Sequence, residues 1–268
     1  MSGNEFIHTA VRAAKSAGQF IKENLGRISK KDIALKQASD FVTLVDKESE
    51  QIIIHTIKEA FPDHFFLAEE SIKENETGEY RWIIDPLDGT TNYIHRYPVF
   101  SISLALEYKK EIILGVTLDI ARDELFTAEK GRGAFLNGKL IKVSEVTTLR
   151  DSLITTGFPF RRKELIDVYL ALFKNVFNKV SDLRRAGSAA LDLAYLACGR
   201  CEGFFEIGLS PWDIAAGAIL IKEAGGIVTD FSGAPDYLVT GNIVAGTPTV
   251  HKEILTEIKS VLKGIIER

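Results

Sequence analysis

Residues 85–92 read Asp-Pro-Leu-Asp-Gly-Thr-Thr-Asn and directly follow an apolar stretch at 82–84, which we expect to be a strand. The octapeptide supplies carboxylate, carbonyl and hydroxyl oxygens, and such hard ligands suit Mg²⁺ or Mn²⁺, whereas zinc favours imidazole and thiolate. Pro86 fixes the local backbone and Gly89 permits a sharp reversal, so Asp85 and Asp88 can share a metal cluster. The segment therefore predicts a metal-dependent phosphate site, with a plain turn at the end of a strand as the alternative.

The same segment also predicts a place for the phosphate. If a helical turn begins after the glycine, the first main-chain N–H groups have no partner within the helix and favour an anion. We therefore expect a phosphate to contact the amides of Gly89, Thr90 and Thr91.

Three further segments carry polar groups at expected strand ends or helix starts. Residues 67–71 end a short apolar strand with Glu69 and Glu70, and because neighbouring strand side chains point to opposite faces, only one of them can reach a given ion. Residues 210–213 predict a helix that starts with Pro211 and carries Asp213 in its first turn, where a carboxylate complementing the helix dipole is the alternative. Ser188 is expected to cap an apolar helix at 190–197, and there a plain cap is the alternative role.

Taken together, the chain resembles the inositol monophosphatase family of lithium-sensitive, magnesium-dependent sugar phosphatases, most closely its bacterial and archaeal branches. The resemblance covers nearly the whole length and rests on residues 38–43 with Asp46, 69–71, 82–92, 131–138, 156–159, 187–192, 212–213 and 223–226. It implies a five-layer αβαβα sandwich with the site between its halves, and a homodimer.

The resemblance also implies roles for individual residues. Glu69, Asp85 and the carbonyl of Leu87 would bind a first metal, and Asp85, Asp88 and Asp213 a second. Thr90, backed by Asp46, would orient a metal-bound water for direct in-line attack on phosphorus. Glu69 would be a catalytic residue together with Thr90 and Asp46. A third and weaker ion would lie near Glu69 among waters.

The outer parts of the site follow from the same resemblance. The substrate hydroxyls would contact Asp88, Asp213, Glu206, Ser188 and the backbone of Ala189. Lys36 would lie at the edge of the metal and water network, although a solvated lysine is the alternative. A cluster of guanidinium groups could border the pocket and bind a second phosphate through paired hydrogen bonds, or form surface or dimer-interface ion pairs instead; its members are Arg161, Arg162, Arg184 and Arg185.

The organisation of the chain agrees with a cytoplasmic enzyme. Its 268 residues, 46% of them hydrophobic, can bury a substantial core. We expect one domain over 1–268, with a mainly antiparallel half at 1–150 that carries the metal-binding loops and a more parallel half at 151–268 that contributes Asp213. The net charge of −4 makes nucleic acid an improbable partner, and no stretch is long and apolar enough for a membrane span.

Local patterns predict further elements and dismiss two motifs. Apolar spacing predicts helices at 5–25 and from a cap at Asp46 to residue 60, and later helices near 163–178, 211–224 and 248–266. Residues 131–133 predict a hairpin and not a dinucleotide loop. Cys198 and Cys201 follow a helix end, so we expect a structural or free thiol pair and not a redox centre.

The donor pattern predicts a Mg²⁺-dependent phosphomonoesterase acting on a small-molecule phosphate ester, with Mn²⁺ as a substitute metal, and the family resemblance implies that this ester is inositol 1-phosphate. The alternative on the same scaffold is fructose-1,6-bisphosphatase activity, alone or beside the first. A regulatory binding protein that keeps the fold is the alternative from a different class.

Overall fold

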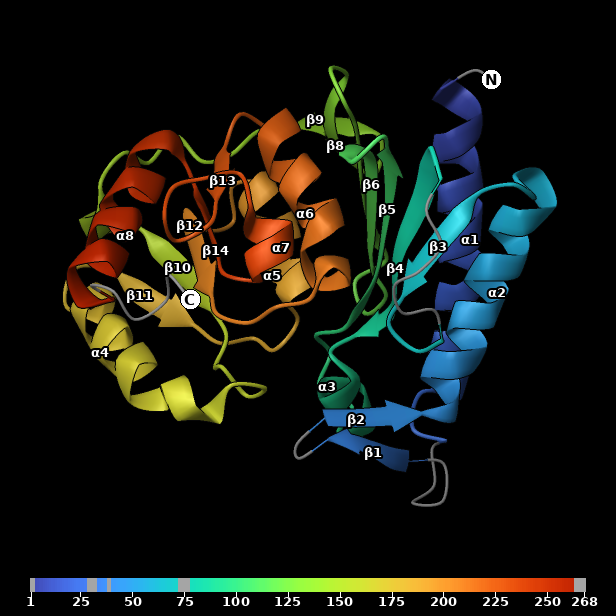
Figure 1. Ribbon diagram of the computed structural model, residues 1–268, viewed down its shortest axis with the longest axis horizontal. Coiled ribbons are helices and arrows are strands. Elements are labelled where there is room, and N and C mark those ends of the chain that lie inside the picture. Colours follow the sequence, from blue (N-terminus) through green and yellow to red (C-terminus); the bar gives the residue numbers. More distant parts are fainter. Residues whose placement is uncertain (1–2, 28–32, 38–39, 72–77, 263–268) are drawn as a thin grey trace.

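The computed structural model describes residues 3–27, 33–37, 40–71 and 78–262, and it contains two large sheets (Figure 1). The first sheet has seven strands in the order β3-β4-β5-β6-β7-β8-β9, and the second has five in the order β11-β10-β12-β14-β13. The strands are β3 (Phe65–Ala68), β4 (Tyr80–Asp88), β5 (Ser101–Tyr108), β6 (Glu111–Asp119), β7 (Glu124–Glu129), β8 (Gly133–Leu136), β9 (Lys139–Ile141), β10 (Leu153–Thr156), β11 (Asp182–Arg184), β12 (Gly203–Glu206), β13 (Ile227–Thr229) and β14 (Ile243–Gly246).

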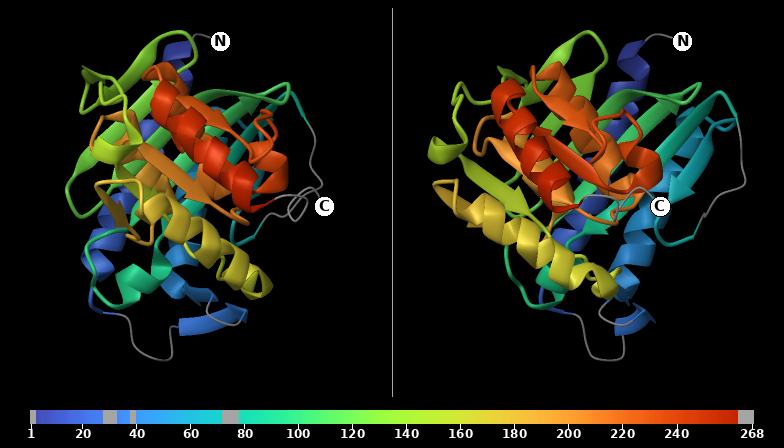
Figure 2. Two further views of the ribbon diagram at one scale, coloured as in Figure 1. Left: turned by 90° about the vertical axis from the view of Figure 1, so that its left-hand side faces the viewer. Right: turned by 60° about the vertical axis from the view of Figure 1, so that its left-hand side comes forward.

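The helices complete five layers, as Figure 1 and the turned views of Figure 2 show. Helices α1 (Gly3–Asn24) and α2 (Leu44–Ala60) cover the outer face of the seven-stranded sheet. Helices α5 (Ala189–Ala197) and α6 (Pro211–Glu223) lie between the sheets, and α4 (Ile166–Phe177) and α8 (Pro248–Val261) cover the other outer face. The predicted αβαβα sandwich is therefore confirmed.

The two sheets differ in strand direction much as the sequence predicts. In the first sheet β3 pairs parallel with β4, and the later neighbours pair antiparallel. In the second sheet β10 is parallel to both β11 and β12, whereas β14 is antiparallel to β12 and β13. The second sheet is thus mixed, and the carboxyl ends of β10 and β12 lie beside each other.

Glycines let helix α6 lie close against both the first sheet and helix α5. A Cβ atom on Gly115 of β6 would lie 2.8 Å from the carbonyl oxygen of Ala216, and one on Gly217 would lie 2.4 Å from Cβ of Leu193 in α5. The helix is buried on all sides between residues 213 and 221, as expected for a helix enclosed by two sheets. This packing fixes the start of α6, and therefore Asp213, against the end of β4.

The smaller elements lie around this core. A hairpin of β1 (Ile33–Gln37) and β2 (Asp40–Thr43) leads into α2 beside α3 (Thr90–Ile94), and α7 (Tyr237–Thr240) follows β13. Short 3-10 turns, η2 (Leu149–Asp151) and η3 (Lys163–Leu165), precede β10 and α4. The predicted hairpin at 131–133 is confirmed, because it joins β7 to β8.

One helix start differs from the prediction. The cap of α2 is Thr43, whose hydroxyl accepts a hydrogen bond from the amide of Val45, and Asp46 is the third helical residue. The Asp46 carboxylate accepts a hydrogen bond from the amide of Thr43 at 2.8 Å, so the two side chains form a reciprocal capping box. Helix α8 ends at Val261, and the last part of the segment expected to be helical, 263–266, lies outside the described residues.

Other predictions about the chain can be compared directly with the structure. The thiols of Cys198 and Cys201 are free, and burial is the main reason that both pKa values are raised.

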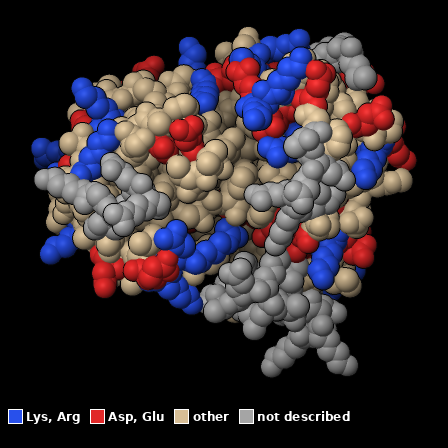
Figure 3. Space-filling model, viewed as in Figure 1, with Lys and Arg blue, Asp and Glu red and all other residues tan. Residues whose placement is uncertain are grey.

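Within the described residues, no helix combines the length and apolar character that a membrane crossing requires. On the face shown in Figure 3, Lys and Arg side chains are interspersed with Asp and Glu around the periphery.

Candidate active site

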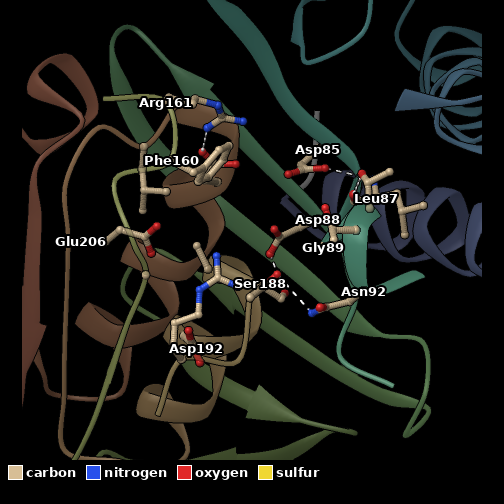
Figure 4. Close-up of a pocket in the computed structure, with 18 of the residues that line it drawn as sticks. Asp85, Leu87, Asp88, Gly89, Asn92, Phe160, Arg161, Ser188, Asp192 and Glu206 are labelled. Atoms are coloured by element: carbon tan, nitrogen blue, oxygen red, sulfur yellow. Dashed lines mark hydrogen bonds and ion pairs between the residues drawn. The ribbon is translucent and has the colours of Figure 1, made fainter. Parts of the chain in front are cut away.

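A cavity of about 300 Å³ opens between the two sheets (Figure 4). It is surrounded by the ends of β3, β4, β10 and β12 and by the starts of α3, α5 and α6. The lining residues include most of the predicted site, namely Glu69, Asp85, Leu87, Asp88, Gly89, Thr90, Ser188, Ala189, Glu206 and Asp213, together with Arg161 and Arg185. Segments that are far apart in the sequence therefore meet at one place.

Three aspartates form the centre of this cavity. Asp85, Asp88 and Asp213 each have a carboxylate oxygen within 4.8 Å of the corresponding oxygens of the other two. Asp85 and Asp88 would lie on opposite faces of a regular strand, but the register of β4 against β5 shifts between them. This irregularity, at Pro86 and Leu87, turns both carboxylates toward the start of α6. Such a group of hard oxygen donors could hold a divalent cation.

The aspartates carry negative charge that their surroundings balance poorly. Burial raises the pKa of Asp85 well above its usual value, and the charges of Glu69, Asp88 and Asp213 raise it further. Burial and the nearby Asp213 raise the pKa of Asp88 to about 7. Burial likewise raises the pKa of Asp213, against the opposing effect of Arg161. A bound cation would relieve this repulsion, and so the donor set fits a metal ion.

Glu69 joins the aspartates from the end of β3. Its main-chain N–H donates to the carbonyl of Ile84 at 3.2 Å, which continues the pairing of β3 with β4 by one residue. Its side chain lines the cavity, whereas that of Glu70 does not. The amide of Glu70 instead donates to Oε2 of Glu50 at 2.8 Å. The geometry therefore follows the alternation expected of a strand.

Thr90 and Asp46 form a hydrogen-bonded pair at the edge of the aspartates. The Thr90 hydroxyl lies 2.8 Å from Oδ1 of Asp46 and 3.1 Å from the carbonyl oxygen of Leu87. Burial raises the pKa of Asp46 to about 6, although hydrogen bonds from Thr43 and Thr90 oppose this effect. Because Asp46 also closes the capping box of α2, its position is set by the helix start.

Gly89 sits where only a glycine fits. Its φ of 89° is left-handed, and a Cβ atom there would lie 2.9 Å from the carbonyl oxygen of Val99. Helix α3 begins at the next residue, as the sequence predicts. The first main-chain N–H groups of this turn therefore have no carbonyl partner within the helix.

The start of α5 contacts Asp88 from the other half of the chain. Ser188 Oγ and the amide of Ala190 both donate to Oδ2 of Asp88, at 2.6 and 2.8 Å. Ser188 also caps α5, as predicted, because it accepts a hydrogen bond from the amide of Leu191. The side-chain amide of Asn92 donates to the carbonyl oxygens of Val99 and Ala186, at 2.7 and 3.0 Å, and so joins the two halves beside this contact.

Glu206 lies on the far side of the cavity from Asp85 (Figure 4). Burial raises its pKa well above the usual value, and the charges of Asp192 and Asp213 add to the effect. A Cβ atom on Gly157 would lie only 2.0 Å from Oε1 of Glu206, so the carboxyl group rests against a bare backbone. The end of β10 therefore leaves the space that Glu206 occupies.

Asp192 and Asn92 belong to the site, although the sequence prediction assigns them no role. Asp192 lines the cavity from the first turn of α5, and burial and the charge of Asp88 raise its pKa well above the usual value. An acid in the first turn of an otherwise apolar helix is the same signal that singles out Asp213. Asn92 closes the octapeptide, and its role in joining the halves depends on residue 186, which sequence spacing could not reveal.

The outer cationic residues separate into two groups. Arg161 and Arg185 line the cavity. Arg162 and Arg184 do not; they pair with Glu164 and Asp182 at exposed positions, so the alternative of surface ion pairs describes them correctly. Lys36 belongs to β1, but its side chain lies outside the described residues.

Comparison with known proteins gives one consistent result. The model of the Inositol monophosphatase family matches residues 3–263. The protein called Nus factor SuhB from Escherichia coli (strain K12) is 46% identical over 263 residues, which is 98% of each chain. The structure of extragenic suppressor protein suhB from Bartonella henselae has a TM-score of 0.91 at 41% identity, covering 95% of this chain and 98% of that one. The inositol monophosphatase from Anabaena has a TM-score of 0.86 at 42% identity, with 96% of each chain covered.

Proposed function

Because the chain belongs to the inositol monophosphatase family, we propose that it is a Mg²⁺-dependent phosphomonoesterase that hydrolyses inositol 1-phosphate. The observation that carries this proposal is the convergence of Asp85, Asp88 and Asp213 within 4.8 Å, beside the hydrogen-bonded pair of Thr90 and Asp46. We further propose that the enzyme is a cytoplasmic homodimer.

The acidic residues would hold the metal. Glu69, Asp85 and the carbonyl of Leu87, which all line the cavity, would form one group of donors, and Asp88 and Asp213 would complete a second group with Asp85. These oxygen donors suit Mg²⁺, or Mn²⁺ in its place. The cation would supply positive charge that makes water easier to deprotonate and stabilises negative charge on phosphate oxygens.

Thr90 and Asp46 would prepare the attacking water. The Thr90 hydroxyl donates its hydrogen to Asp46, so its oxygen can accept a hydrogen bond from a water in the cavity. As the water attacks phosphorus, its proton passes to Thr90 Oγ1, and the hydrogen of Thr90 passes to Asp46. The amides of Gly89, Thr90 and Thr91 would hold the phosphate in line with this water.

The opposite wall would bind the alcohol part of the substrate. Ring hydroxyls can donate to Glu206, Asp88 and Asp213, and the backbone of Ala189 with Ser188 adds further polar contacts. A cavity of about 300 Å³ is at the small end of the range for ligand sites, which favours a compact ester with one ring.

Fructose 1,6-bisphosphate is the alternative substrate on the same site. Arg185 lines the cavity, and its guanidinium group lies over the ring of Phe158, 5.6 Å from the centroid. A guanidinium in this position can bind a second phosphate through two parallel hydrogen bonds. Arg161 is less available, because it pairs with Asp213.

A panel of phosphate esters assayed with the purified protein tests the proposal. We expect inositol 1-phosphate to be hydrolysed with Mg²⁺, slower hydrolysis of fructose 1,6-bisphosphate, and no turnover after chelation. The variant Asp88→Asn should lower kcat by orders of magnitude while its unfolding curve changes little, and Asp236→Asn, at an exposed position, is the matched control. Turnover that is indifferent to metal, or an active Asp88→Asn enzyme, would reject the proposal.

A role as a Nus factor is the second candidate, favoured by the name of relatives such as the Escherichia coli protein. An Escherichia coli strain that lacks its own SuhB can be supplied with this chain, either unchanged or as Asp88→Asn. If both forms restore what the strain has lost with its own SuhB, the role is independent of hydrolysis. Failure of both forms, with stable expression, would argue against this role.

A further inference from the structure

Arg161 places a positive charge inside the acidic end of the cavity. Its Nη1 atom lies 3.2 Å from Oδ2 of Asp213, and its Nη2 atom lies 3.9 Å from Oε1 of Glu69. Glu69 follows a strand of the first sheet, whereas Asp213 lies at the start of the helix between the sheets, so the guanidinium bridges carboxylates from both halves of the chain. Both carboxylates belong to the donor set that we propose for metal.

Asp213 does not need Arg161 to stay in position. Its Oδ2 atom also accepts a hydrogen bond from the main-chain N–H of Ser210 at 2.7 Å, which is part of the capping box of α6. The start of α6 is itself fixed by close packing on the first sheet. The helix cap therefore already orients the Asp213 carboxylate, and the ion pair with Arg161 is an additional contact.

In this same position the guanidinium also lies over an aromatic ring. Its Cζ atom lies 4.7 Å from the centroid of the Phe160 ring, a distance at which a cation is attracted by the aromatic face. The side chain is 24% exposed, so it lies at the mouth of the cavity and not deep within it. Main-chain hydrogen bonds from Phe160 to Phe158 and from Arg162 to Pro159 close the loop on itself. The side chain could thus move outward while the backbone of this loop stays in place.

We infer that Arg161 is an internal cation that competes with divalent ions for Asp213 and Glu69. The ion pairs neutralise part of the acidic cluster in the metal-free protein, and a divalent ion can use these two carboxylates fully only when the guanidinium moves away from them. The affinity for such an ion is therefore lower than the carboxylates alone would give. The inference rests on the proposed metal site and deepens it, because it names the residue that tunes metal affinity.

Titration of the metal-free full-length protein with Mn²⁺ alone, followed by calorimetry, tests this competition without reference to turnover. Arg161→Gln removes the charge and keeps a polar side chain of similar reach, so we expect the weakest-bound ion to bind about tenfold more tightly, a change of about 1.4 kcal/mol. Arg161→Lys keeps the positive charge and should remain closer to the unchanged protein. Arg162→Gln is the matched control, because this neighbour on the same loop pairs with Glu164 away from the cavity.

The outcomes separate this inference from the proposed function. If the unchanged protein binds no Mn²⁺, the metal site and the inference both fail. If it binds Mn²⁺ but Arg161→Gln binds it equally or more weakly, the competition is wrong and the metal site stands. Should Arg161→Gln fail to fold, a crystal structure of the unchanged protein with Mn²⁺ decides the question, because an intact pair between Arg161 and Asp213 beside a bound ion would overturn the inference.

Discussion

The hydroxyl of Ser188 lies 2.6 Å from Oδ2 of Asp88, although the two residues are 100 positions apart in the sequence. The amide of Ala190 donates to the same oxygen at 2.8 Å, so the carboxylate is held by the first turn of α5. Ser188 is also the cap of that helix. One side chain thus couples a helix start in the second half of the chain to an acid of the proposed metal site.

Replacement of Ser188 by alanine should weaken both functions of this side chain. We expect the variant Ser188→Ala to lower the free energy of unfolding by about 1–3 kcal/mol, because it loses a helix cap and a hydrogen bond to a charged group. Denaturant unfolding measures this change. Ser260→Ala is the control, since Ser260 is exposed on α8 and donates to the carbonyl of Glu257 in the same helix. An equal loss in both variants would contradict the special role of Ser188.

Thr90 and Asp46 should behave as one unit in catalysis. The variant Thr90→Val keeps the shape of the side chain but removes the hydroxyl, and we expect kcat to fall about 10²–10⁴-fold with a smaller change in KM. Adding Asp46→Asn should cost little more, because neither residue can act without the other. Steady-state kinetics of the single and double variants test this, with Thr56→Val as a remote control on α2. Additive losses would show that the residues act separately.

Divalent cations should stabilise the fold in the absence of substrate. The buried acids repel one another, and an ion that binds only the folded state adds about 2.7 kcal/mol of stability at a concentration of 100 times Kd. The melting temperature of metal-free protein should therefore rise with Mg²⁺. Asp85→Asn keeps an oxygen that can accept the hydrogen bond from the amide of Leu87, yet it should abolish most of this rise. An equal rise in both proteins would place the ion elsewhere.

His64 should make stability depend on pH. It lies stacked between the rings of Phe61 and Tyr80, and its Nδ1 atom accepts a hydrogen bond from the indole of Trp82 at 3.0 Å, which requires this nitrogen to be unprotonated. Burial lowers the pKa of His64 below its usual 6.5, although Asp63 opposes the shift. The unfolded chain therefore binds the proton more readily, so the stabilisation is fully present above pH 6.5 and is lost as the pH falls below it.

The expected slope is at most about 1.4 kcal/mol per pH unit for this group. Denaturant unfolding at several pH values should show that the difference in stability between the unchanged protein and His64→Phe shrinks below pH 6.5. The comparison is made by difference, because the raised pKa values of buried acids such as Asp46 and Asp88 change stability with the opposite sign. His55→Gln, on the exposed face of α2, should keep the original slope, and an unchanged slope in His64→Phe would refute the role of His64.

Gly157 should control the position of Glu206. A methyl group at residue 157 would overlap the Glu206 carboxyl group, so we expect Gly157→Ala to displace that group and to raise KM for inositol 1-phosphate about tenfold. In a Glu206→Ala background the methyl group has space, and the further change at residue 157 should have little effect. Steady-state kinetics of the single and double variants test this coupling. If Gly157→Ala changed KM equally in the unchanged and Glu206→Ala backgrounds, the coupling would be excluded.

The sequence by itself determined the elements and the closeness of two central acids. The apolar spacing of α1, the cap and proline that start α6, and the turn between β7 and β8 are local signals, and local signals fix local backbone. Asp85 and Asp88 are close in the chain, so a short turn is enough to bring them together. The resemblance of the motifs then extended the site to Asp213, and the structure places that acid beside them.

Only the tertiary structure decided which of several similar residues reaches the cavity. Arg161 and Arg162 are neighbours of identical chemistry, yet one pairs with Asp213 and the other with Glu164 at the surface. Asp46 is held at the start of α2 by the capping box with Thr43, and only the fold brings it to Thr90, 44 positions away in the sequence. These outcomes depend on how α6 packs between the two sheets and on how the halves face each other, and such long-range contacts leave no periodic signal in the sequence.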